Sequence, residues 1–134
     1  METEFAPGVA WLEPFYEEVR DLIPKRKIIH TVKGYSTKIG QIPTLGATHT
    51  DKLEKEYDIT LKAWTIYYDG KRSPYLAYYM LEVFAHELAH VKHWDHNAAH
   101  MRLTSRILTR FAAYAKRKGL NLEAKTCKKL GKLY

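Results

Sequence analysis

The chain has 134 residues, of which 46% are hydrophobic and 28% charged, and these ordinary values exclude bulk disorder. No stretch approaches the roughly 18 uninterrupted apolar residues of a membrane helix. The acidic start has no signal-peptide pattern, and the single cysteine, Cys127, excludes an intramolecular disulfide and a cysteine zinc cluster. We therefore expect one cytoplasmic domain over residues 1–134, with no membrane partner, in which any metal is held by histidine and carboxylate.

Charge and histidine are unevenly distributed along the chain. The net charge is +7, yet residues 1–96 sum to −2 and residues 97–134 sum to +9. Five of the seven histidines fall within 15 residues, namely His86, His90, His93, His96 and His100. These two asymmetries direct the search for function to the second half of the chain.

The first part of the chain predicts a short helix and then three strands. Glu13-Pro14 opens a helical pattern in which Phe15, Val19, Leu22 and Ile23 share one face, and Pro24 ends it. Extended segments follow at residues 27–32, 40–48 and 57–68. The first should stop at Gly34, and Pro43 should confine the second to an edge or a bend. In the third, Ile59, Leu61 and Ala63 alternate with polar residues and form the buried face, and Asp69-Gly70 supplies a turn.

Two long helices are predicted after this turn. Ser73 and Pro74 provide a hydroxyl N-cap and a proline at the first helical position, so a helix should run from Tyr75 to about Lys92. A second helix should cover residues 97–118, and the tail over residues 121–134 has room for one or two more helical turns. This order predicts an α+β fold with a small, mostly antiparallel sheet packed on long helices.

The first long helix contains His86-Glu87-Leu88-Ala89-His90, the HExxH pattern. Residues four apart lie above one another on a helix, so both imidazoles can reach one metal ion. Glu87 is close enough to accept a proton from water without being a ligand, which suits hydrolysis.

A catalytic zinc ion needs a third protein ligand and an open fourth position. His93 is excluded because it lies seven residues from His86, which is about 10.5 Å along the helix axis. His96 can return to the ion if the chain bends after the helix, and His100 is the alternative. A carboxylate ligand from the second helix is nearly excluded, because residues 97–122 contain no Asp or Glu.

From His86 to His96 the chain reads HELAHVKHWDH, and over about residues 57–103 it resembles the SprT-like and WLM zinc metallopeptidases. The resemblance implies a zincin-like minimal metallopeptidase domain with one zinc ion, held by His86, His90 and His96. It also implies Glu87 as general base and acid, and a sheet edge that receives an extended peptide. In those families an aromatic residue commonly follows the third histidine by four or five residues, whereas His100 and Met101 stand at these positions here.

Several other residues are weaker candidates. Asp95 could orient a ligand imidazole or cap the second helix, and Glu82, one turn before His86, could orient it or be solvated. A group of tyrosines could supply a donor to an oxyanion, although we expect most of them to pack: Tyr67, Tyr68, Tyr75, Tyr78 and Tyr79. Cys127 has no evident partner.

The second long helix carries a basic stripe and an adjacent apolar stripe. The basic stripe spans about 80° and comprises Arg102, Arg106, Arg110 and Arg117. Leu103, Ile107, Phe111 and Tyr114 form the stripe expected to be buried. Further lysines follow at positions 116, 118, 125, 128, 129 and 132. We expect DNA or RNA to bind this basic surface through phosphates, with a solvated face as the alternative and an anionic membrane as a weaker one.

The leading hypothesis is a zinc metallopeptidase that acts on a protein or peptide substrate, including proteins associated with nucleic acid. One alternative is a nucleic-acid-binding module whose histidines hold a structural metal, and another is a zinc hydrolase that cleaves a different bond. Glu87 favours an enzyme, because a structural site prefers four ligands and has no use for a carboxylate between them.

Overall fold

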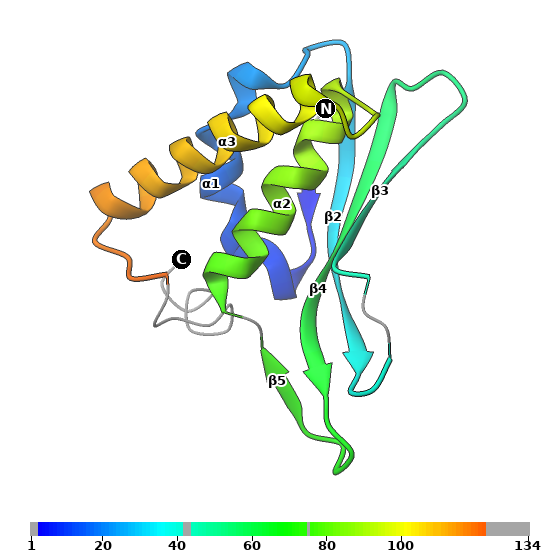
Figure 1. Cartoon of the computed structure of the whole chain (residues 1–134), viewed down its shortest axis with the longest axis vertical. Helices are drawn as coiled ribbons and strands as arrows, with labels where there is room; N and C mark the ends of the chain where they lie inside the picture. The colour runs from blue at the N-terminus through cyan, green and yellow to red at the C-terminus, as the bar shows by residue number, and fades with distance from the viewer. Residues whose placement is uncertain (1–2, 42–43, 75, 123–134) are drawn as a thin grey trace.

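The computed structural model describes residues 3–41, 44–74 and 76–122 (Figure 1). Its elements in chain order are β1 (Glu4–Phe5), the 3-10 helix η1 (Pro7–Leu12), α1 (Glu13–Glu17), the 3-10 helix η2 (Arg20–Leu22), β2 (Ile28–Lys38), β3 (Gly46–Thr50), β4 (Glu56–Ile66), β5 (Arg72–Pro74), α2 (Ala77–Lys92) and α3 (Ala98–Arg117). No helix in these ranges is both long enough and apolar enough to span a membrane. Pro43, Tyr75, Cys127 and the predicted helical turns and lysines from residue 123 onward lie outside the described residues.

The five strands form one mixed sheet in the order β1-β2-β4-β3, and β5 also pairs with β4. The α+β class is confirmed, but the prediction of a mostly antiparallel sheet is wrong. The two 11-residue strands, β2 and β4, run parallel, whereas β3 and β5 pair antiparallel with β4. The chain reverses direction once between β2 and β3 and again between β3 and β4, so β4 returns in the direction of β2.

Strand β2 does not stop at Gly34 as predicted but continues to Lys38. A Cβ atom at Gly34 would lie 3.0 Å from the Cβ of Ala63 and 3.1 Å from a methyl of Val9. Glycine at this position therefore lets η1 pack close against the sheet, which is a recognised use of glycine inside a strand. Strand β4 follows the predicted alternation, with Ile59, Leu61 and Ala63 fully buried.

The predicted helix start at Ser73-Pro74 is also wrong, because both residues belong to β5, which pairs with the end of β4. The Asp69-Gly70 turn forms as expected, with Gly70 at a φ of 81°, and the hairpin continues into β5. Proline is tolerated on such an edge strand, where its missing N–H group is not needed. Helix α2 begins at Ala77 without a side-chain cap.

The helices lie on one side of the sheet, with α2 packed against β3 and β4 and α3 packed against α2 (Figure 1). Both predicted apolar faces are buried, the one around α1 and η2 (Phe15, Val19, Leu22, Ile23) and the one on α3 (Leu103, Ile107, Phe111, Tyr114). Phe84 of α2 stacks on Phe111 of α3 with ring centroids 5.9 Å apart. This packing fixes α2, with its HExxH segment, between the sheet and α3.

Candidate metal centre

Helix α2 brings His86 and His90 together through its own geometry. The two residues are four apart in a continuous helix, and their Nε2 atoms lie 3.2 Å from each other. The Nδ1–H of His90 donates a hydrogen bond of 2.8 Å to the carbonyl of Trp94. This bond fixes the tautomer of His90 and leaves its Nε2 lone pair directed at His86, as in metal-ligating histidines.

His96 reaches the same point because the chain bends after α2. The helix ends at Lys92, His93 is extended, and the side chain of Asn97 caps α3 by accepting from the backbone N–H of His100 at 2.9 Å. The Nε2 of His96 consequently lies 3.0 Å from the Nε2 of His86. Three nitrogens around a tetrahedral zinc ion with bonds of about 2.0–2.1 Å are about 3.3 Å apart, close to the spacings found here.

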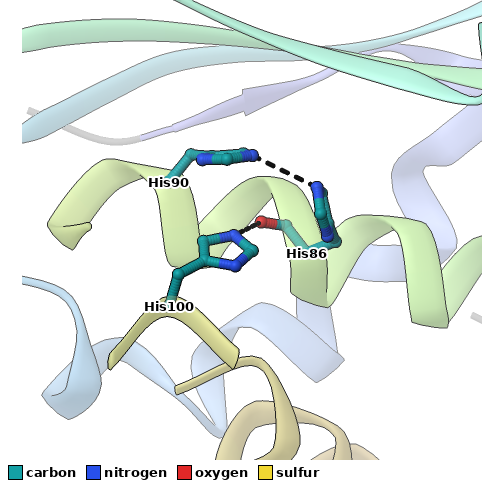
Figure 2. Close-up of side chains that lie close together, drawn as sticks. All are labelled: His86, His90 and His100. Atoms are coloured by element: carbon teal, nitrogen blue, oxygen red, sulfur yellow. Dashed lines mark hydrogen bonds between the residues drawn. The ribbon is translucent and has the colours of Figure 1, made fainter. Parts of the chain in front are cut away.

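His100 is the fourth member of this histidine cluster. Its ligand nitrogens lie within 4.8 Å of those of His86 and His90, so these three residues form a second possible metal-binding set. Figure 2 shows, however, that His100 rises from α3 to the main chain of α2, where its Nε2 lies 3.0 Å from the carbonyl oxygen of His86. A carbonyl can only accept, so that Nε2 carries a proton and is not available to a metal. Only Nδ1 of His100 could act as a ligand, which favours the set with His96.

The pKa values of three histidines of the cluster favour cation binding. Burial, assisted by the neighbouring histidines, lowers the pKa of His86 to about 4. Burial also lowers the pKa of His90 and that of His100, which are 8% and 2% exposed. A lowered pKa favours the neutral imidazole, so protons compete less with a metal ion for the lone pairs of these three residues. Figure 2 shows the ring of His90 pointing toward that of His86.

Glu87 is buried beside the cluster and is held by the edge strand β3. Its side chain is 5% exposed, and burial raises the pKa of the carboxyl group, an effect that the hydrogen bond from Thr48 partly opposes. The hydroxyl of Thr48 lies 3.0 Å from Oε1 of Glu87 and 3.0 Å from its backbone carbonyl oxygen. Thr48 therefore joins β3 to α2 at the carboxylate that the HExxH pattern assigns to proton transfer.

Gly46 allows this close approach of β3 to α2. A Cβ atom on Gly46 would lie 2.6 Å from a methyl of Val83 and 3.1 Å from Oε2 of Glu87. Any side chain at this position would push the strand away from the helix. Sequence reasoning missed both Thr48 and Gly46, because neither lies in a local motif and both act only through the packing of β3 on α2.

Glu87 lines two open cavities. One, of about 410 Å³, is lined by Leu45, Gly46, Glu82, Val83, His86 and Glu87. The other, of about 390 Å³, is lined by Ala47, Thr48, Glu87, His90, Trp94, Asp95 and His96. Successive residues of one strand thus border both cavities, and an extended chain beside β3 would pass Glu87 and the imidazoles with space on either side.

Three weaker predictions have different outcomes. Asp95 does not cap α3, because Asn97 does, but Asp95 does line the second cavity. The tyrosines Tyr67, Tyr68, Tyr78 and Tyr79 are between 44% and 89% exposed, and of these the rings of Tyr78 and Tyr79 pack against each other with centroids 6.0 Å apart. Glu82 makes no hydrogen bond to His86 within the described chain and lies in the wall of the first cavity.

Two of the four arginines of the predicted stripe on α3 form ion pairs with residues that the structure describes, and two do not. Arg110 pairs with Asp21 at 2.6 Å, and Arg117 pairs with Glu18 at 2.7 Å, so both tie α3 to the α1–η2 segment. Arg102 and Arg106 are exposed. The stripe is therefore not uniformly available to a partner.

Comparison of the chain with protein-family models, with curated proteins and with solved structures finds no match. Function must therefore be inferred from the geometry of the site.

Proposed function

We propose that this protein is a zinc-dependent metallopeptidase of the SprT-like and WLM type, with His86, His90 and His96 as ligands. The observation that carries the proposal is the position of Glu87, which is buried beside three convergent imidazoles and lines two open cavities. A structural metal site would not need a carboxylate held in this way. A zinc ion bound there would lower the pKa of water and polarise a carbonyl group.

The residues of the chain account for the remaining steps. An extended peptide would add to the outer edge of β3, the last strand in the order of the described sheet, through main-chain hydrogen bonds. Glu87 would take a proton from the attacking water and deliver it to the leaving amine. Thr48 would hold the carboxylate toward the scissile bond during both transfers.

The substitution Glu87→Gln tests this function. It should leave zinc content and the urea unfolding curve nearly unchanged and should lower hydrolysis of an unstructured protein substrate by about 100-fold or more. Glu13→Gln, an exposed site on α1, removes the same charge and is the control. Undiminished hydrolysis by Glu87→Gln would refute the mechanism. Zinc-dependent turnover of esters but of no peptide would favour a different hydrolase, and metal binding without any turnover would favour a structural site.

A basic surface supports a second proposal, that the protein also binds DNA or RNA through phosphates. A cavity of about 440 Å³ is lined by four cationic residues from two distant segments, Lys25, Arg26, Lys27 and Lys92, together with His93. Its one acidic residue, Asp21, is already paired with Arg110, and the charges of Lys92 and Arg102 add to burial in lowering the pKa of His93. Positive charge from residues 25–27 thus lies beside the end of α2.

Salt dependence tests this second proposal. The logarithm of the affinity for labelled single- and double-stranded DNA should fall linearly with the logarithm of salt concentration, by roughly 0.7–0.9 per phosphate contacted. Replacing Lys92, Arg102 and Arg106 by glutamine should flatten the slope. The control replaces three exposed lysines outside this surface, Lys38, Lys52 and Lys55. Equal slopes for the two triple variants, or no binding at low salt, would refute a specific phosphate surface.

A further inference from the structure

The cavity on the Leu45 side of Glu87 combines apolar walls with two carboxylates, those of Glu87 and Glu82. Leu45 and Val83 contribute aliphatic surface, and Gly46 contributes bare main chain. Glu82 contributes the carboxylate that the proposed mechanism does not use, from a position one helical turn before His86 on α2. Leu45 is 46% exposed and the cavity is open, so a group from outside can enter it.

The side chain of Glu82 has no partner within the described residues. No hydrogen bond or ion pair joins its side chain to another residue of the described ranges, although Lys and Arg outnumber Asp and Glu by 22 to 15 in the chain. Among the cavity-lining residues of α2, Glu82 lies farthest from Glu87, because the separation of five residues between these positions corresponds to about 7.5 Å of helix axis. A positive group placed at Glu82 would therefore lie about one helical turn from His86 and farther from Glu87.

We propose, on the basis of the proposed peptidase function, that this cavity binds a lysine or arginine side chain of the substrate, next to the scissile bond. The aliphatic stem packs on Leu45 and Val83, as such stems do on apolar surface, and the charged head pairs with Glu82. A leucine side chain would use the walls but leave the Glu82 carboxylate partly desolvated without a partner. An acidic side chain would be repelled by Glu82 and Glu87. The substrate class is therefore a polypeptide with a basic residue at one of the two positions that flank the cleaved bond.

The test uses unstructured peptides that differ at one position, scanned on each side of the cleaved bond. Arginine is compared with citrulline, which has nearly the same shape without the charge. We expect kcat/KM to be about tenfold or more higher for arginine at one position. This ratio should fall to near one in Glu82→Gln, and Glu82→Lys should favour glutamate instead. Glu13→Gln controls for the change in net charge.

The outcomes separate this inference from the proposed function. If the wild type cleaves arginine and citrulline peptides equally well, the assignment of the cavity is wrong and the peptidase function stands. If no peptide is cleaved, the peptidase function fails, and binding of the same labelled peptides to zinc-loaded Glu87→Gln tests the cavity directly. A tenfold arginine preference in binding that is lost in the Glu82→Gln, Glu87→Gln double variant would support the cavity. Equal affinities would overturn it.

Discussion

Replacing Thr48 by valine removes one hydroxyl group from the site and keeps the shape of the side chain. In the structure that hydroxyl is 3.0 Å from both Oε1 and the main-chain oxygen of Glu87, and the carboxylate is almost fully buried. Valine leaves Oε1 without this donor. The carboxylate then loses the contact that fixes its direction relative to the imidazoles.

The expected size of the effect follows from the geometry. A hydrogen bond to a charged group contributes about 1.5–3 kcal/mol, which corresponds to a factor of about 10 to 150. The hydroxyl has a single proton for two acceptors at equal distance, so the lower end of this range applies. We therefore expect kcat of Thr48→Val to fall about tenfold, with KM changed by less than about twofold because the wall of the cavity keeps its shape.

The assay measures kcat and KM on an unstructured peptide together with zinc content and the free energy of unfolding. Thr48→Ser retains the hydroxyl and should recover most of the rate. Thr50→Val is the matched control, because it removes a hydroxyl from the same strand that bonds instead to the carbonyl of Glu56 at 3.1 Å. Wild-type kcat in Thr48→Val, or a loss in Thr48→Ser as large as in the valine variant, would refute the positioning role of Thr48.

Three further predictions concern the metal, the strand and pH. His96→Ala should lower zinc affinity more than His100→Ala. The loss of affinity in His100→Ala should be at most roughly 10- to 100-fold, the range typical of a residue that orients a ligand. Chelator competition measures both affinities, and the reverse ranking would assign the third ligand to His100. Gly46→Ala should lower the free energy of unfolding by about 1–3 kcal/mol, because the new methyl group overlaps α2; an unchanged urea midpoint would contradict this. In the metal-free protein the pKa of His86 is lowered from 6.5 to about 4, so the unfolded chain binds a proton that the folded chain does not. The free energy of unfolding should therefore be highest above pH 6.5 and fall as the pH is lowered toward about 4, and His86→Gln should make this dependence shallower. An equal slope for the two proteins in urea unfolding would contradict the shift.

The part of the site that could be read from sequence depends on local periodicity. An α-helix places residues four apart on one face whatever packs against it, so the HExxH spacing is enough to bring His86 and His90 together. The absence of acids from residues 97–122 and the excessive distance from His86 to His93 then leave His96 and His100 as candidates for the third ligand. Helical periodicity also identified the buried face of α3 correctly, and the alternation of apolar and polar residues identified that of β4.

The errors arise where a local signal competes with a distant partner. Ser73-Pro74 is a good helix start by itself, but β4 offers this segment a strand partner, and the pairing prevails. Gly34 is a good strand end by itself, yet η1 packs against the strand only because no side chain is there. The parallel pairing of β2 with β4 likewise depends on where the chain returns after β3, which no short sequence window contains.

The remaining features of the site exist only because distant segments meet. Thr48 holds Glu87, and Gly46 admits the strand that carries Thr48, because β3 lies directly over α2. Arg110 forms an ion pair with Asp21, which precedes it by 89 residues, so its charge is not available to a partner on the basic surface. Hydrogen bonds and ion pairs of this kind depend on distances of a few ångströms between separate elements. Such distances follow from the packing of the whole sheet and its helices, whereas the period of a single helix follows from its backbone alone.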